Sequence, residues 1–126
     1  MHVKREIDAS DRVVILGISG ELNDEGLRTL AAELRSAQEI TPDFGLLIDF
    51  RNAVGRDVTT QGVRALAAES LVLSPDSRRA LVVPSDLGFG MGRMYQMLRE
   101  GQGGQINVFR DIDEARRWVT RREQDS

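Results

Sequence analysis

The densest group of side chains that could bind a ligand lies between Leu87 and Leu98. Three of the four methionines in the chain fall within seven residues there. Methionine side chains are flexible and polarisable, so they suit adaptable apolar sites. Ligand pockets add a few polar groups to such walls, and Tyr95 and Arg93 can supply them, the arginine by pairing with a carboxylate or phosphate. The predicted ligand-binding residues are Leu87, Phe89, Met91, Arg93, Met94, Tyr95, Met97 and Leu98.

The same segment also has a purely structural interpretation. Met91, Met94, Tyr95 and Leu98 recur at the spacing of one helix face, which is typical of a helix that covers a sheet. Met97 lies off that face, so it is either exposed or lines a cavity. The sequence leaves both interpretations open.

The remaining motifs do not predict catalysis or nucleotide binding. The glycines of Gly88–Gly92 fit neither common phosphate-loop spacing and no lysine follows them, so we expect close packing or a flexible lid. The chain has no cysteine, and its one histidine, His2, lies near a terminus, so we expect neither a metal site nor a Ser-His-Asp triad. Asp49 is expected to have a structural role, paired with Arg51 or with the backbone. Acid–base catalysis needs paired groups with matched pKa values, and the sequence offers no convincing pair. We therefore predict no catalytic residue, no cofactor and no enzymatic activity.

Composition narrows the classes of protein further. The 17 basic and 20 acidic residues give a net charge of −3, without the basic excess that a nucleic-acid-binding protein needs. The longest early apolar run, Val13–Ile18, is far shorter than the roughly 20 residues that cross a bilayer, and no signal-peptide pattern precedes it. We therefore expect a cytoplasmic protein with no transmembrane segment. Its 126 residues fit one domain spanning residues 1–126.

Apolar patterning predicts an α/β domain in the order ββαβαβαβα. The expected strands are residues 3–8, 12–19, 44–50, 80–83 and 106–109, and helical periodicity covers Leu27–Leu34, Val63–Leu71, Met91–Leu98 and Ile112–Val119. A polar connection, residues 51–60, follows the third strand. The first two strands form an antiparallel hairpin, and the alternation after them predicts a mixed, mostly parallel five-stranded sheet with four helices. The expected helix caps are Asn23 or Asp24, Thr59 or Thr60, Ser85 or Asp86, and Asp111.

Three segments resemble the SpoIIAA-like branch of the STAS domains (sulfate transporter and anti-sigma factor antagonist). They are residues 18–22 (ISGEL), the stretch from Ala80-Leu-Val-Val-Pro84 through Gly90-Met-Gly-Arg-Met-Tyr95, and residues 108–118 (VFRDIDEARRW). The resemblance implies a small cytoplasmic bacterial domain without catalytic activity. Regulatory relatives bind partner proteins and are switched by phosphorylation, whereas the similarity in shape to Sec14-type lipid-binding domains implies an apolar ligand.

The phosphorylation motif that the resemblance implies is only partly present. In the antagonist branch the acceptor serine directly follows an aspartate at a helix start, where free N–H groups and positive potential suit a phosphate. The matching aspartate is Asp57, and Val58, which has no hydroxyl, stands in the acceptor position. Thr59 or Thr60 could substitute, although one of them is expected to be the helix N-cap instead.

Two functions remain open on these grounds. The first is a non-catalytic binding module for a small apolar or lipid-like ligand, which predicts a cavity beside the methionine-rich helix. The alternative is a regulatory domain that binds a protein partner, with or without phosphorylation. A weak homodimer is also possible, because edge strands and apolar helix faces are available.

Overall fold

The computed structural model describes residues 1–69, 73–74, 76–102 and 104–120. Its five strands are β1 (His2–Asp8), β2 (Val13–Asn23), β3 (Gly45–Asp57), β4 (Arg78–Val82) and β5 (Gln105–Phe109). Its four helices are α1 (Asp24–Ser36), α2 (Thr60–Ala68), α3 (Asp86–Leu98) and α4 (Ile112–Thr120). The strands lie side by side in chain order; β1 is antiparallel to β2, and the other three pairs are parallel. The predicted fold class and element order are confirmed.

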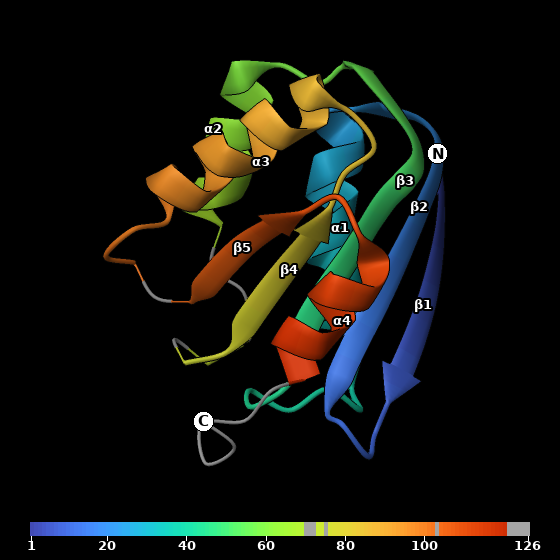
Figure 1. Cartoon of the computed structure of the whole chain (residues 1–126), viewed down its shortest axis with the longest axis vertical. Helices are drawn as coiled ribbons and strands as arrows, with labels where there is room; N and C mark the ends of the chain where they lie inside the picture. The colour runs from blue at the N-terminus through green and yellow to red at the C-terminus, as the bar shows by residue number, and fades with distance from the viewer. Residues whose placement is uncertain (70–72, 75, 103, 121–126) are drawn as a thin grey trace.

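The order of the strands decides where the helices lie. Each crossover from β2 to β5 moves one strand along in the same direction, so right-handed connections place α1, α2 and α3 on one face of the sheet. The last helix, α4, covers the opposite face, in front of the sheet in Figure 1, with α1 behind it. The sheet therefore has a face with three helices and a face with one.

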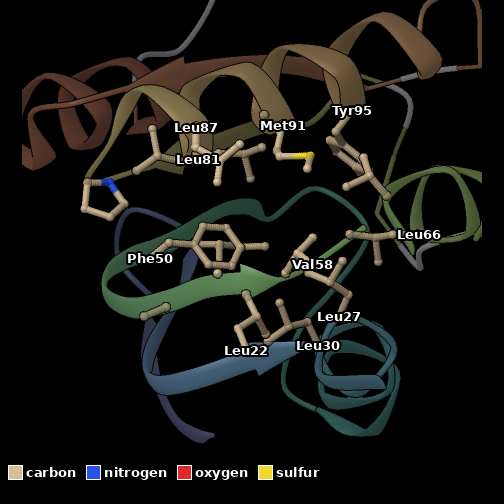
Figure 2. A pocket seen from close by; sticks show the side chains of 18 of the residues that line it. Leu22, Leu27, Leu30, Phe50, Val58, Leu66, Leu81, Leu87, Met91 and Tyr95 are labelled. Carbon is tan, nitrogen blue, oxygen red and sulfur yellow. The ribbon is translucent and has the colours of Figure 1, made fainter. Parts of the chain in front are cut away.

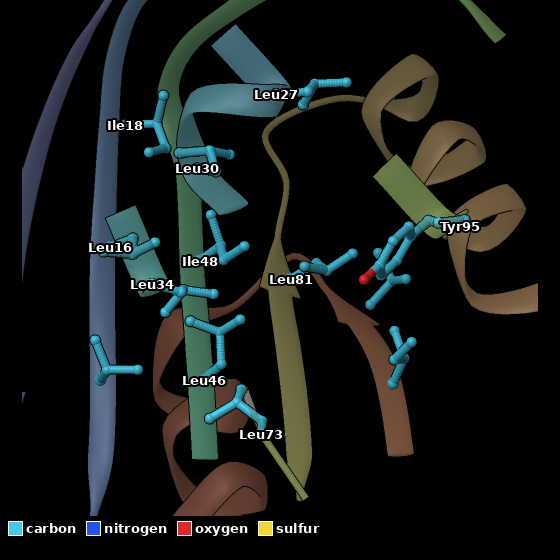
Figure 3. Packing of buried hydrophobic residues seen from close by; sticks show 14 of the residues in the cluster. Leu16, Ile18, Leu27, Leu30, Leu34, Leu46, Ile48, Leu73, Leu81 and Tyr95 are labelled. Atoms are coloured by element: carbon cyan, nitrogen blue, oxygen red, sulfur yellow. The ribbon is translucent and has the colours of Figure 1, made fainter. Parts of the chain in front are cut away.

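Each face has its own hydrophobic cluster. The α1–α3 face buries alternate residues of the central strands, among them Leu16, Ile48 and Leu81, as Figure 3 shows. The α4 face buries the other set, from Val13 on β2 to Val119 on α4. The rings of Phe109 and Trp118 extend this second cluster, with centroids 5.7 Å apart.

The third strand is longer than its apolar residues predict. The sequence places a polar connection at residues 51–60, but β3 continues to Asp57 and pairs with β2 from Ser19↔Asn52 to Asn23↔Asp57. Most side chains of this extension are exposed, so backbone pairing rather than apolar burial holds it in the sheet. The prediction that the strand ends at Phe50 is therefore wrong.

The helix boundaries follow the predicted caps. The side chains of Asn23, Thr59 and Ser85 accept bonds from backbone N–H groups at the starts of α1, α2 and α3. Asp111 accepts two such bonds at the start of α4. The second helix begins at Thr60 and ends at Ala68, and the predicted end at Leu71 lies outside the described residues. None of the helices in the described ranges is long and apolar enough to cross a membrane.

Candidate ligand-binding site

The α1–α3 face carries a cavity of about 490 Å³ that is partly open to solvent. This volume lies within the range of 300–1,000 Å³ that is usual for small-molecule sites. In Figure 2, Leu87, Met91 and Tyr95 point from α3 across the cavity toward Phe50 on β3 and Leu30 on α1. Its size and its apolar lining make it the candidate ligand-binding site of the described residues.

Four elements besides α3 supply most of the cavity wall. Strand side chains alternate between the faces of a sheet, so Leu46, Ile48 and Phe50 of β3 reach the cavity, and Arg79 and Leu81 of β4 do the same. The extension of β3 instead contributes consecutive residues, 53–56. Leucines of α1 recur on one helix face and close the opposite side, and Val63 and Leu66 of α2 complete the wall. The main apolar lining residues of the sheet and α1 are Leu27, Leu30, Leu34, Leu46, Ile48, Phe50, Leu81 and Val83.

The cavity opens at the carboxyl ends of β3 and β4. Val54 and Leu87 line this mouth and are 46% and 61% exposed. Arg56 lies beside them and makes only a loose contact of 3.9 Å with Glu21. Ligands of open α/β sheets enter at this end of the strands.

Two glycines explain why α3 leaves space beneath one of its sides. A Cβ atom on Gly92 would lie 3.0 Å from Val108 Cγ1, and one on Gly88 would lie 3.2 Å from Val83 Cβ. These glycines are one helical turn apart, so α3 lies close against β4 and β5 along that line. Close glycine packing is confirmed for Gly88 and Gly92, whereas a Cβ atom on Gly90 would meet nothing within 4 Å. The larger side chains of α3 extend over the neighbouring space.

Only part of the predicted ligand-binding set lines the cavity. Leu87, Met91 and Tyr95 do so, at successive turns of α3. The structure places the other five outside the cavity lining, because a helix turns its side chains by about 100° per residue. Phe89, Met94 and Leu98 pack against the hydrophobic core. Arg93 and Met97 are exposed.

The main polar side chain that sequence reasoning missed is Arg79. It is 2% exposed and lines the cavity, and its Nη1 lies 3.4 Å from Tyr95 Oη. The strand alternation that directs Leu81 and Val83 toward α3 also directs Arg79 there. That alternation was the available signal, but the predicted strand began at Ala80 and left the arginine out.

The threonine pair at the start of α2 has a structural role. The Asp24 carboxylate accepts bonds from Thr59 N at 2.9 Å and Thr59 Oγ1 at 2.6 Å, and Thr59 Oγ1 accepts one from Gly62 N at 3.0 Å. The hydroxyl and N–H of Thr59 hold the pKa of Asp24 below its ordinary value. Thr59 is therefore the helix cap, as expected, while Thr60 is exposed at the first position of α2.

Asp49 and Arg51 form the expected pair in the middle of β3. Arg51 donates from Nε and Nη2 to the two carboxylate oxygens, each at 2.9 Å, and its backbone N–H adds a third bond. Burial raises the pKa of Asp49, but the bonds from Arg51 together lower it below its ordinary value. Neither residue lines the cavity.

Comparisons with known proteins identify the fold. No family model matches the sequence, and a search of curated proteins finds no match. A crystal structure of an uncharacterized protein of the DUF3478 family from Shewanella loihica PV-4 matches at 18% identity and a TM-score of 0.61, over 94% of this chain and 92% of that one. That protein is described as having a SpoIIAA-like fold. The chain has the same SpoIIAA-like fold. The resemblance seen in the sequence is confirmed at this level.

A second solved structure with this general architecture is more distant. The STAS domain of an antisigma-factor antagonist from Rhodobacter sphaeroides shares 12% identity and a TM-score of 0.38, over 90% of this chain and 89% of that one. This similarity is too low to carry an argument about function. The likeness to these structures shows the fold alone, and neither description supports the predicted apolar ligand.

Proposed function

We propose that this SpoIIAA-like domain is a non-catalytic binding module that holds a small apolar molecule between α1, α2, α3 and the sheet. The observation that carries the proposal is the cavity of about 490 Å³ with almost wholly apolar walls and one mouth. An apolar guest that covers these walls removes apolar surface from water, which favours binding. Each CH₂ group that leaves water for such a site gains about 0.8 kcal/mol.

The ligand would also contribute to the stability of the fold. A molecule that binds only the folded state stabilises it by about 2.7 kcal/mol when its concentration is a hundred times its Kd. The lining comes from residues far apart in the chain, between Leu22 and Tyr95, so the cavity exists only after the fold has formed. Binding therefore raises the melting temperature.

The direct test is titration of the protein with 1-decanol, followed by calorimetry and by the melting temperature. Met91→Trp fills the cavity from α3, and Met97→Trp makes the same substitution on the same helix at a side chain that is 60% exposed. We expect Met91→Trp to weaken decanol binding at least tenfold and Met97→Trp to leave it unchanged. Wild-type protein that binds neither decanol nor an apolar dye contradicts the proposal.

A regulatory domain that binds a protein partner is the second candidate. It is favoured by the exposed segment at the start of α2, where Asp57, Thr59 and Thr60 all face solvent. A phosphate on Thr59 would break its bonds to Asp24 and bring two negative groups together, so Thr60 is the better acceptor. A cytoplasmic location and a weak homodimer remain predictions.

The two threonines separate this candidate from a structural role. Thr59→Ala should lower the free energy of unfolding by about 1 kcal/mol, the usual effect of losing a helix cap. Thr60→Ala should change it little. A phosphorylation switch requires that Thr60→Ala alter partner binding or its response to a kinase, and equal behaviour of Thr60→Ala and wild type argues against one.

A further inference from the structure

The cavity contains a buried positive charge with no anionic partner. Arg79 is 2% exposed, and within the described residues no carboxylate lies within ion-pair distance of its guanidinium. Its Nε has no hydrogen-bond partner, and Nη1 has only the long contact of 3.4 Å to Tyr95 Oη. An arginine side chain stays charged in proteins, and a buried charge without a partner is costly.

The position of Arg79 is fixed on two sides. Its neighbours across β3 and β5 are Leu46 and Ile106. A Cβ atom on Gly104 would lie 3.1 Å from Arg79 Cζ, so the guanidinium lies against the backbone at that glycine. The same position lies 3.3 Å from Nε and from Nη2, so the chain closes this side of the guanidinium. The Nη1 edge is the one directed to Tyr95, beside which Arg79 lines the cavity.

Arg79 marks the end of the cavity opposite the mouth. The residues of the β4 segment that face the cavity run from Arg79 through Leu81 to Val83, beside the mouth. Four residues of strand span about 13 Å. Tyr95 is the matching residue on α3, two turns from Leu87 at the mouth, and Figure 3 shows its hydroxyl directed toward the sheet. Its hydroxyl proton has no acceptor among the described residues.

We infer that the ligand carries a carboxylate, which binds the guanidinium of Arg79 and the hydroxyl of Tyr95 while its apolar chain extends toward the mouth. This inference rests on the proposed function and names the ligand class of the same site. The guanidinium has already lost its water when the protein folds, so the carboxylate meets a desolvated donor group. A charged hydrogen bond formed there is about twice as strong as a neutral one.

The charge of the site favours a carboxylate over a phosphate. One guanidinium balances one negative charge, whereas a phosphate monoester brings nearly two at neutral pH. The other arginine on the cavity wall, Arg56, is at the mouth with its side chain 76% exposed, and water screens it. The head group therefore lies at the inner end.

The test compares decanoate with 1-decanol, which have the same chain length and differ in charge, by calorimetry at pH 7. We expect wild-type protein to bind decanoate about tenfold to a hundredfold more tightly than decanol, the effect of a hydrogen bond to a charged group. Arg79→Met should bring the ratio of the decanol Kd to the decanoate Kd close to one and leave decanol binding intact. Arg56→Met is the matched control, and it should leave the ratio unchanged.

A second variant covers the case in which Arg79→Met does not fold. Tyr95→Phe keeps the ring and should lower the ratio about fivefold, as expected for one lost hydrogen bond. A ratio near one in wild-type protein overturns the carboxylate inference and leaves the apolar-ligand proposal standing. A ratio lost in Arg56→Met but kept in Arg79→Met also overturns it, because the head group would then lie at the mouth. Failure of both probes to bind overturns the inference and the proposed function together.

Discussion

The two faces of the sheet are packed in different ways. On the α4 face, Ala80, Val82 and Ala115 are completely buried, and one short helix closes the cluster. On the α1–α3 face, three helices together leave a cavity of about 490 Å³. The number of helices that cover a face therefore does not decide how densely its core is packed. Small residues let α4 sit close to the sheet. In α3, Gly88 and Gly92 lie close to Val83 and Val108 on one side of the helix, and the cavity lies beside this line of contact.

The largest expected difference between the faces comes from side-chain truncation. Leu47 is completely buried on the α4 face, and Leu47→Ala should lower the free energy of unfolding by about 3 kcal/mol, since a dense core cannot collapse around the lost atoms. Met91 already borders empty space, so Met91→Ala should cost about 1 kcal/mol. Urea unfolding of both variants measures this, and equal losses would show that the two faces are packed alike.

Replacing an alanine by leucine should change the stability in opposite directions on the two faces. Ala115→Leu would force α4 away from the sheet, and it should cost about 2 kcal/mol. Ala31 lines the cavity, so Ala31→Leu fills existing space and should stabilise the ligand-free protein by up to about 1 kcal/mol. Melting temperatures of the pair test the comparison, which fails if Ala31→Leu destabilises the protein as much as Ala115→Leu.

The smallest expected effect is that of pH, which should change the stability of the fold but not ligand binding in the cavity. The folded-state pKa values of Asp24 and Asp49 lie below their ordinary values, so their contribution to stability is present above about pH 4 and is lost as pH falls through the lower folded values. Asp24→Asn should therefore make the fall of the melting temperature at acid pH less steep. No aspartate, glutamate or histidine of the described residues lines the cavity, so decanol binding should stay constant between pH 5 and 8. A change in binding over that range would contradict this division.

Much of the architecture is predictable from the sequence because it depends on local patterns. The alternation of strand and helix, the antiparallel hairpin and the four helix caps all follow from residue type and spacing, and the structure confirms them. The extension of β3 through residues 51–57 is not predictable in this way. Its polar side chains carry no burial signal, and its pairing depends on β2, which is distant in the chain.

The site is predictable only in part, for a similar reason. A helix periodicity places Leu87, Met91 and Tyr95 on one face, but it does not say which neighbouring residues share their space. The contributions of Phe50 and Arg79 depend on how three crossovers stack on one face of the sheet. Of the two positions that the sequence leaves open for Met97, the structure shows the exposed one.

The most direct test of the cavity as the binding site is to locate a bound alkyl chain by NMR. Intermolecular NOEs from decanol should reach the methyl groups of Leu30, Leu66 and Met91, which line the cavity. They should be absent from Val13 and Val119 on the α4 face. NOEs to the α4 face, or a bound probe with no NOE to the three cavity residues, would contradict the claim that the space beneath α3 is the binding site.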